Sequence, residues 1–317
     1  CKVNEIDHDI CGKVVVATNY DEVKALEGLA SRGKINGLEK LKFLTKSELK
    51  KREPFVVSEK SLLVPQEGIV DYKKVQQTLK QIIISNGGQI KQNEKVVSLK
   101  SSNKNVLETL ENEYKFDLLF NCAGLHADRI YTKLTKLKPQ IKIIPFRGEY
   151  FKFKDNYKNY VNHLVYPVPD SKFPFLGVHF TRMINGDREV GPNAVLAMKR
   201  EGYSNTEISF KDSFDSLTYG GLIKFILNNF SFSLNEFKSS LSKNLFIKKA
   251  KKMIPDVDSK MFEKGISGVR AQAVESNGNL LMDFNIIKHN NQVHVLNAPS
   301  PGATASLAIA DYVLNNI

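Results

Sequence analysis

Cysteine is scarce in this sequence: Cys1, Cys11 and Cys122 are too few and too scattered for a disulfide framework or a zinc cluster. No pair of histidines has metal-ligand spacing, so we expect no metal site. No apolar run approaches the ~18 residues of a membrane-spanning helix. The opening residues lack the apolar core of a signal peptide, and because the first residue is not methionine we expect that an N-terminal part is missing.

Positive charge is in excess, with 46 Lys and Arg against 34 Asp and Glu and a formal net charge of +12. A basic chain suits nucleic acid, anionic lipid or an anionic substrate. The lysines are spread out and no nucleic-acid-binding motif accompanies them, so we expect no nucleic-acid partner. The densest basic stretch, Lys238 to Lys252, has a helix-like pattern that includes Phe237, Leu241, Leu245 and Phe246. We interpret it as a solvated helix face, with peripheral membrane contact as the alternative.

The first half of the chain alternates between helical and extended patterns. A helix is predicted over 21–31, and a second begins after Asp71 and ends at Gly87-Gly88. Val14 to Ala17 read as a buried strand, and 96–99 with 106–110 as a hairpin. The run 116–120 is nearly all apolar, which is typical of a buried parallel strand.

The second half is β-rich over 141–191 and helical over 207–253. Strands are predicted at 280–286 and 293–296, and a closing helix from about Thr304. This order predicts an α/β fold that carries an α+β insert.

Two turns rich in small residues follow predicted strands. The first, Asn121-Cys122-Ala123-Gly124, ends an apolar strand, which is where open α/β sheets bind ligands; an ordinary strand-ending turn is the alternative. The second runs from Asn297 to Ser306 and leads into a helix whose free N–H groups face the loop. Simple capping of that helix by Ser300 or Thr304 is the alternative. Two such turns in one chain favour a bulky cofactor.

Three arginines lie beside glycine, aromatic or apolar residues and are candidates for binding carboxylates: Arg147, Arg182 and Arg270. Taken singly, each is more often a structural ion-pair partner. His179 follows an apolar strand, where a histidine is usually a satisfied core residue, but beside a substrate it becomes a general base. We expect His126, His163 and His294 to be structural.

Several stretches resemble L-2-hydroxyglutarate dehydrogenases (oxidases), flavoproteins of the D-amino-acid-oxidase-like superfamily, over essentially the whole chain. The more specific of these are Phe173 to Arg182 and Asn297 to Pro301. The others include Cys11 to Ala17, Pro65 to Asp71, Phe120 to His126, Pro145 to Tyr150, Tyr166 to Phe173, Gly191 to Ala194, Lys199 to Tyr203 and Gly268 to Gln272.

The resemblance implies an FAD-binding, Rossmann-like domain intertwined with a β-rich substrate domain. The FAD domain is expected at 71–130 and 262–317. The substrate domain is expected at 131–261 with a helical insert, and 1–70 supplies a further part of it and the connection. The family's Gly-x-Gly-x-x-Gly motif, which holds the FAD pyrophosphate, is absent from these 317 residues. We therefore expect a truncated chain that binds FAD poorly or is inactive by itself.

The resemblance also implies roles for individual residues. L-2-hydroxyglutarate would be oxidised to 2-oxoglutarate by hydride transfer to the flavin, with His179 as base. Arg270, Arg182, Arg147 and Tyr166 are expected to bind the dicarboxylate substrate. The residues expected to border the flavin are Asn121, Ala123, Gly124, Ser300, Gly302, Ala303 and Thr304.

Other readings stay open. The chain could be another superfamily oxidase, acting on an amino acid or hydroxy acid, or a non-catalytic scaffold. The electron acceptor is undetermined between quinone, oxygen and another carrier. The resemblance implies a cytoplasmic or inner-membrane location in a bacterium and a mitochondrial one in a eukaryote.

Overall fold

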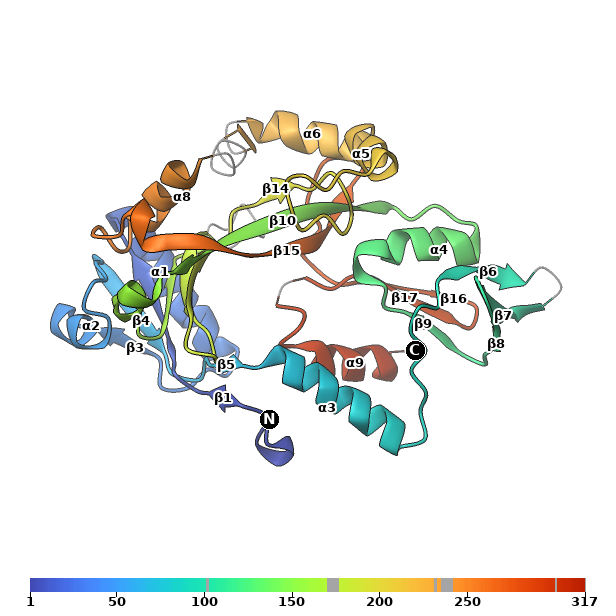
Figure 1. Cartoon of the computed structure of the whole chain (residues 1–317), viewed down its shortest axis with the longest axis horizontal. Helices are drawn as coiled ribbons and strands as arrows, with labels where there is room; N and C mark the ends of the chain where they lie inside the picture. The colour runs from blue at the N-terminus through green and yellow to red at the C-terminus, as the bar shows by residue number, and fades with distance from the viewer. Residues whose placement is uncertain (101–102, 170–176, 231–232, 235–241, 300, 317) are drawn as a thin grey trace. The chain divides into compact units, whose positions relative to one another are not determined.

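The computed structural model describes residues 1–100, 103–169, 177–230, 233–234, 242–299 and 301–316 (Figure 1). The chain divides into two compact units, each assembled from three stretches of sequence. The first unit contains Cys1–Ile90, Gly148–Ala194 and Leu234–Ser267, and the second contains Lys91–Arg147, Val195–Ser233 and Gly268–Ile317. The chain therefore alternates between the two units, as the predicted intertwined fold requires.

A mixed sheet runs through the first unit. Its strands, in spatial order, are β10 (Ile141–Phe153), β13 (Arg188–Gly191), β12 (His179–Arg182), β11 (Leu164–Pro167), β2 (Lys13–Ala17), β4 (Lys60–Val64) and β3 (Lys42–Leu44). Strand β2 is parallel to β11 and antiparallel to β4. Strand β15 (Phe262–Glu275) pairs with β10. The predicted strand at Val14 to Ala17 is confirmed, and it is buried because it lies inside this sheet.

Side chains of β2 alternate between two apolar layers. Val14 and Val16 lie in a core with Phe180 of β12 and Phe246 of α8 (Lys243–Ala250). Val15 and Ala17 lie in the other layer, against α1 (Tyr20–Ile35). Asn19 caps the start of α1, because its side chain accepts a hydrogen bond from the main-chain N–H of Glu22. The helix predicted over 21–31 is therefore confirmed and is longer than predicted.

The remaining helices of the first unit are α2 (Lys46–Arg52) and α3 (Tyr72–Ser85). The predicted cap of α3 is confirmed, because the Asp71 carboxylate accepts hydrogen bonds from the N–H groups of Lys73 and Lys74. Two residues of its apolar face, Ile82 and Ile83, are exposed. The short strands β1 (His8–Asp9) and β5 (Ile69–Val70) pair with each other, and β5 directly precedes α3 in the sequence.

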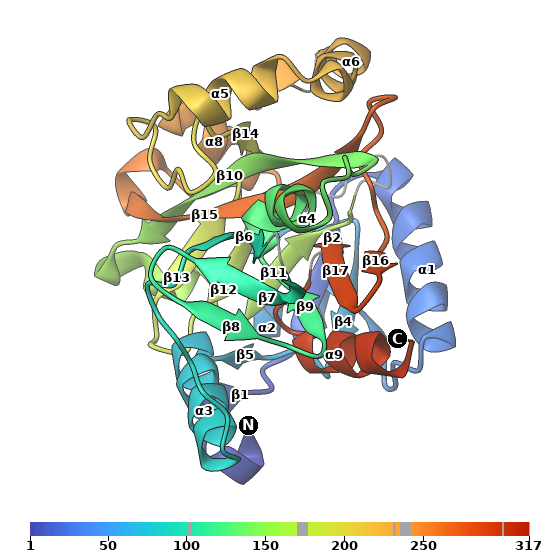
Figure 2. The ribbon, with the colours of Figure 1, turned by 90° about the vertical axis from the view of Figure 1, so that its right-hand side faces the viewer.

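The second unit contains two small sheets. One consists of β16 (Asn285–His289), β17 (Gln292–Asn297) and β9 (Leu119–Asn121), side by side in Figure 2. The other consists of β6 (Val96–Lys100), β7 (Asn103–Thr109) and β8 (Glu113–Lys115), which confirms the predicted hairpin. Strand β14 (Val195–Leu196) pairs with β10. The helices are α4 (Ala127–Thr135), α5 (Phe210–Leu217), α6 (Gly220–Asn228) and α9 (Ser306–Asn315).

Three details of the sequence prediction are corrected here. The apolar run 116–120 was expected to be a buried strand, but β9 is short and lies at an edge of its sheet in the described part of the chain, so Leu118 and Phe120 are exposed. The strand is parallel, as expected, and its partner is β17. The strand predicted at 280–286 begins only at Asn285, and the closing helix begins at Ser306.

The basic stretch Lys238 to Lys252 is described only in part. Phe237 and Leu241 lie outside the described residues. Phe246 is fully buried in the core of the first unit, whereas Leu245 is exposed. Phe246 is therefore unavailable to a membrane surface.

The predicted domain boundaries differ from the limits of the compact units. Residues 71–90 belong to the first unit, and 195–233 share the second unit with β9 and β17. Compactness and ligand binding are different criteria, so the assignment of 71–130 and 262–317 to an FAD domain stays a prediction.

Candidate active site

The turn after β9 is held by the side chain of Asn121, which is buried. Its Nδ2 donates a hydrogen bond to the carbonyl of Ala127 at 2.9 Å. Its Oδ1 accepts one from the N–H of Ala123 at 3.2 Å. Gly124 follows with a φ of 51°, a conformation that residues with a side chain rarely adopt. Asn121 therefore shapes the backbone at Ala123 and Gly124 with its own polar atoms.

His294 supports Asn121 from β17, where the two residues are register partners. Asn121 Nδ2 lies 3.1 Å from His294 Nδ1 and donates to it. The proton of the neutral ring is then on Nε2, which donates to Gln292 Oε1 at 3.1 Å. Burial lowers the pKa of His294 to about 4, so the ring is neutral near pH 7. His294 is buried, as predicted, and supports the turn.

This turn and the segment after β17 line one apolar cavity in the second unit. Its volume is about 490 Å³, within the range of small-molecule sites. Two of the predicted cofactor-binding residues, Gly124 and Gly302, are in its lining. The other lining residues are Phe120, Cys122, Ala271, Val295, Leu296, Asn297, Ala298, Ser306, Ile309, Ala310, Val313 and Leu314.

The other predicted flavin neighbours have different surroundings. Asn121 and Ala123 line a cavity of about 590 Å³ whose lining includes Lys95 and Lys133. Thr304 donates a hydrogen bond to the carbonyl of Pro301 at 2.9 Å. Capping of the last helix by Thr304 is wrong, because the N-cap residue is Ala305 and no side chain caps it. Ala303 lies in the same turn as Thr304, and Ser300 lies outside the described residues.

In the first unit, His179 and Tyr166 form a stacked pair. Their ring centroids are 4.0 Å apart and their planes differ by 24°. His179 is buried, and its Nδ1 lies 2.9 Å from the carbonyl oxygen of Gly177. A carbonyl only accepts, so Nδ1 carries the proton of the neutral ring and Nε2 is the basic nitrogen. Stacking and this hydrogen bond together fix the orientation of the imidazole.

Tyr166 is itself constrained. Burial raises its pKa to about 12 against the opposing effect of a hydrogen bond with Thr181, so the phenol keeps its proton near pH 7. The Nζ of Lys13 lies 5.2 Å from the Tyr166 ring centroid, and Lys13 is paired with Glu67 at 2.5 Å. Tyr166 can therefore position His179 or donate a hydrogen bond, but it is unsuited to act as a base.

The three candidate arginines have different partners. Arg182 forms an ion pair with Asp9. Arg147 is buried and donates hydrogen bonds to the carbonyl of Ser204, at 3.0 Å, and to the Asn205 side chain. Arg270 is half-buried on β15, next to Ala271 of the apolar cavity. The partners of Arg182 and Arg147 are features that the sequence does not reveal.

His163 and His126 lie beside glutamates, and their assignment as structural residues stays a prediction. His163 Nδ1 lies 2.8 Å from Oε1 of Glu53, which is completely buried, and His126 lies 3.5 Å from Glu201. Among the described residues, no group of three or more His, Cys, Asp or Glu side chains could hold a metal ion.

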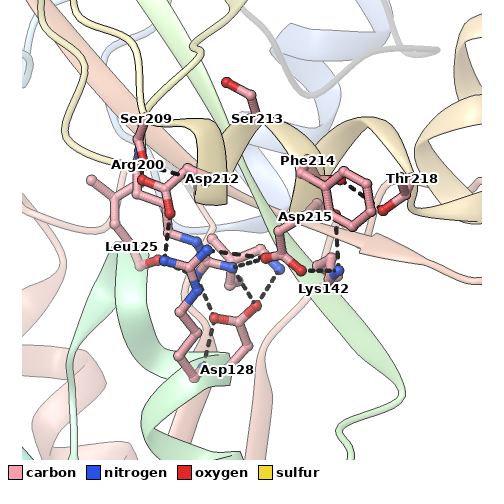
Figure 3. A network of polar contacts seen from close by, with 12 residues as sticks. Leu125, Asp128, Lys142, Arg200, Ser209, Asp212, Ser213, Phe214, Asp215 and Thr218 are labelled. Atoms are coloured by element: carbon pink, nitrogen blue, oxygen red, sulfur yellow. Dashed lines mark hydrogen bonds and ion pairs between the residues drawn. The ribbon is translucent and has the colours of Figure 1, made fainter.

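A buried ionic network lies next to the Gly124 turn and was missed by the sequence analysis (Figure 3). Arg200 donates to both carboxylate oxygens of Asp128 and to the carbonyl of Leu125. Arg129 pairs with Asp212 at 2.6 Å, and Asp215 pairs with Arg129 and with Lys142. Arg200, Asp212 and Asp215, from the segment 200–215, are the residues that pair with Asp128 and Arg129 of α4. A basic residue 72 positions from its carboxylate gives no signal in the sequence.

A family model described as FAD dependent oxidoreductase matches residues 2–315. The chain belongs to this family. An L-2-hydroxyglutarate dehydrogenase of Indibacter alkaliphilus is 42% identical over 314 residues, which cover 99% of this chain and 79% of the relative. The enzyme of that name from Escherichia coli K12 is 40% identical over 320 residues, covering 100% of this chain and 75% of the relative.

Solved structures share this fold. A dithionite-reduced L-α-glycerophosphate oxidase of Mycoplasma pneumoniae, with FAD bound, has a TM-score of 0.73 at 23% identity. The match covers 98% of this chain and 73% of that one. Membership of the family makes this protein an enzyme with FAD as cofactor, and it confirms the predicted fold class.

The apolar cavity of the second unit fits part of that cofactor. Phe120, Val295 and Ile309 offer apolar surface to a flat ring system, and Gly124 and Gly302 have no side chain to fill the space. The Gly-x-Gly motif of the family is absent from the 317 residues, so no residue is assigned to the FAD phosphates.

Proposed function

We propose that this protein oxidises L-2-hydroxyglutarate to 2-oxoglutarate. The observation that carries the proposal is the 42% identity, over nearly the whole chain, with a relative named for this activity. The sequence and the site residues described above support it.

The reaction removes two hydrogens from the CH–OH group at C2 of the substrate, one from oxygen and one from carbon. The hydroxyl proton goes to a base, the hydrogen on C2 leaves with its electron pair as hydride, and a C=O bond forms. FAD, when bound, supplies the hydride acceptor. The tasks of the protein are to bind the substrate, to orient it and to accept the proton.

His179 is the proposed base. Its Nδ1–H is directed to the carbonyl of Gly177, which leaves Nε2 as the proton acceptor of the neutral ring. The stacked ring of Tyr166 restricts rotation of the imidazole. A base with one orientation loses less entropy in reaching the transition state.

Arg270 is proposed to bind the carboxylate next to the hydroxyl group, as the family resemblance implies. Arg182 and Arg147 are the candidates for the distal carboxylate. Arg182 is already paired with Asp9, and Arg147 with the 204–205 loop. On substrate binding, each guanidinium is then either shared between its present partner and the substrate or released by that partner. Guanidinium groups suit this task because they bind carboxylates through two parallel hydrogen bonds.

The electron acceptor is proposed to be a quinone or oxygen. The proposed location is the cytoplasm or the inner face of a bacterial membrane, or the mitochondrion in a eukaryote. None of the described helices is long and apolar enough to cross a bilayer.

The test is anaerobic bleaching of the bound flavin by L-2-hydroxyglutarate, with the D-enantiomer as control. It is run on the 317-residue chain and on the protein as its gene encodes it, after flavin content has been measured. We expect bleaching by the L-enantiomer only. A monocarboxylic analogue, L-2-hydroxypentanoate, measures the contribution of the distal carboxylate.

Variants separate the proposed roles. His179→Gln is expected to slow bleaching by roughly 10²–10⁴-fold at saturating substrate. Arg270→Lys is expected to weaken substrate binding more than it slows bleaching. A yellow protein that stays oxidised with both enantiomers would refute the substrate, and a protein that carries no flavin in either form would refute the enzyme itself.

A further inference from the structure

Lys13, Tyr166 and His179 lie on the same face of the sheet in the first unit. Side chains alternate between the two faces along a strand, and register partners on neighbouring strands point to the same face. Lys13 of β2 and Thr181 of β12 are both register partners of Leu164 in β11. Tyr166 lies two positions from Leu164, and His179 lies two positions from Thr181. The side chain of Lys13 therefore shares its face with the stacked pair.

Arg182 lies on the other face of this sheet. It is two positions beyond Phe180, which is buried in one core cluster with Val14, the neighbour of Lys13 in the sequence. Arg182 is therefore turned away from the face that carries the proposed base. Arg147, the other candidate for the distal carboxylate, belongs to the second unit.

The ammonium group of Lys13 lies close to the proposed base. Its Nζ is 5.2 Å from the ring centroid of Tyr166, and that centroid is 4.0 Å from the ring centroid of His179. The sum of these two distances is the upper limit for the separation of Lys13 Nζ from the centre of the imidazole. An extended five-carbon dicarboxylate can span such a separation, because a hydrogen bond at each end adds to the length of the molecule.

Lys13 is paired with Glu67, and the two side chains differ in exposure. Lys13 Nζ lies 2.5 Å from Glu67 Oε1, and the side chains are 19% and 42% exposed. An ammonium group has three N–H donors, and Glu67 is the one acceptor that it contacts in the described part of the chain. Since Glu67 is the more exposed partner, it can turn to water while Lys13 stays in place. The carboxylate of a ligand can therefore share Lys13 with Glu67 or replace it.

We propose that Lys13 binds the distal carboxylate of the substrate and thereby favours a dicarboxylate over a monocarboxylate. The inference rests on the proposed function, with His179 as the base at the hydroxyl group. The ring of Tyr166 holds the ammonium group beside the site by a cation–π contact. Glu67 neutralises Lys13 when no substrate is bound, so it competes with the distal carboxylate.

The first test measures binding without oxidation. Glutarate and pentanoate lack the hydroxyl group and are not oxidised at C2, so calorimetry on the flavin-loaded protein reports their affinities. Lys13→Met is expected to weaken glutarate binding roughly 10–100-fold and to change pentanoate binding less than about twofold. Glu67→Gln is expected to strengthen glutarate binding, because the competing charge is removed. A merely structural role of the pair predicts weaker binding in both variants.

The matched control is Lys60→Met, on the neighbouring strand β4. Lys60 Nζ is paired with Glu27 at 2.5 Å and lies 4.6 Å from the ring centroid of Phe43. The control therefore removes the same kind of ion pair and ring contact at another place on the sheet. It is expected to leave both affinities unchanged. Arg182→Met is expected to keep the preference for glutarate over pentanoate.

The second test is anaerobic bleaching of the flavin. With Lys13→Met, we expect half-maximal bleaching to require a higher concentration of L-2-hydroxyglutarate, while the rate at saturation changes little. Bleaching by L-2-hydroxypentanoate, which has no distal carboxylate, should be the same with and without the substitution. A loss of the rate at saturation alone would contradict a role in binding.

Two further results would overturn the inference. One is an equal effect of Lys13→Met and Lys60→Met on glutarate binding, and the other is loss of the preference for glutarate in Arg182→Met but not in Lys13→Met. If the unsubstituted protein is not bleached by L-2-hydroxyglutarate, the proposed function is refuted and the inference with it. Flavin content and thermal midpoint are measured on every variant. Should Lys13→Met fail to fold, Lys13→Gln and Glu67→Gln provide the same comparison.

Discussion

Replacing Asp128 by alanine leaves an unmatched charge inside the second unit, together with two main-chain N–H groups that lose their acceptor. The Asp128 side chain is 6% exposed, and it accepts hydrogen bonds from the main-chain N–H groups of Arg129 and Ile143 as well as from Arg200. The Arg200 side chain is 2% exposed, so in the variant its charge stays in the interior. Its nearest remaining carboxylate, that of Asp215, is 3.6 Å away.

The expected loss follows from these contacts. Removing one partner of a buried pair destabilises a protein by roughly 3–5 kcal/mol. Asp215 offsets part of this, so we expect a loss of about 3 kcal/mol, which lowers the thermal midpoint by roughly 6–12 °C for a unit of this size. Replacing both partners, Asp128→Leu with Arg200→Met, is expected to be less costly than Asp128→Ala because no charge is left unmatched.

The assay is thermal unfolding followed by circular dichroism and by flavin fluorescence. The control is Asp155→Ala, which removes an exposed partner of Lys158 and is expected to leave the midpoint unchanged. The reasoning fails if Asp128→Ala unfolds within 2 °C of the unsubstituted protein, or if the double variant is less stable than Asp128→Ala.

Three further predictions use other contacts. The pKa of His294 is about 4 in the folded state and about 6.5 when unfolded, so the unfolded chain binds more protons and stability falls as pH drops from about 6.5 to 4, by roughly 3 kcal/mol. His294→Gln should flatten this slope in urea unfolding at pH 7 and pH 4.5; equal slopes would contradict it. Gly221→Ala should lower the thermal midpoint, whereas Gly220→Ala, which has open space, should not. Tyr166→Phe keeps the ring stacked on His179 and should bleach at nearly the normal rate, whereas Tyr166→Leu should be slower at unchanged flavin content.

Much of the fold is local enough to be read from the sequence. The cap of α3 at Asp71 and the hairpin β6–β7 depend on residues a few positions apart, and both predictions are confirmed. Phe120 was predicted to be buried because an apolar run does not reveal whether its strand lies at the centre or the edge of a sheet. The edge position depends on which strands pair, and pairing is not local.

Helix α5 shows that a sequence pattern does not reveal which side of a helix is buried, because its polar side faces inward and its phenylalanines are exposed. Its pattern of Phe210 and Phe214 on one side and Asp212 on the other predicts an amphipathic helix, and the natural expectation is that the phenylalanines are buried. The polar side is inside because Arg129, 83 positions earlier in the chain, reaches Asp212. The position of that arginine depends on the folded unit.

The sequence allowed candidate site residues to be chosen, but it did not reveal which other residues they contact. Asn121, Ala123 and Gly124 could be chosen from the turn sequence, whereas the support of Asn121 by His294 joins residues 173 positions apart. The same holds for the pair of Arg182 with Asp9. Long-range partners are set by topology, and a single sequence carries no direct record of them.

The parallel pairing of β9 with β17 has a consequence for synthesis of the protein. The ribosome makes residues 119–124 well before the other wall of their cavity, 295–314. Until then the edge of β9 and the apolar side chains around Phe120 have no partner from the C-terminal segment. We therefore expect nascent chains of this protein to depend on chaperones until that segment has been made, and to form the apolar cavity only afterwards.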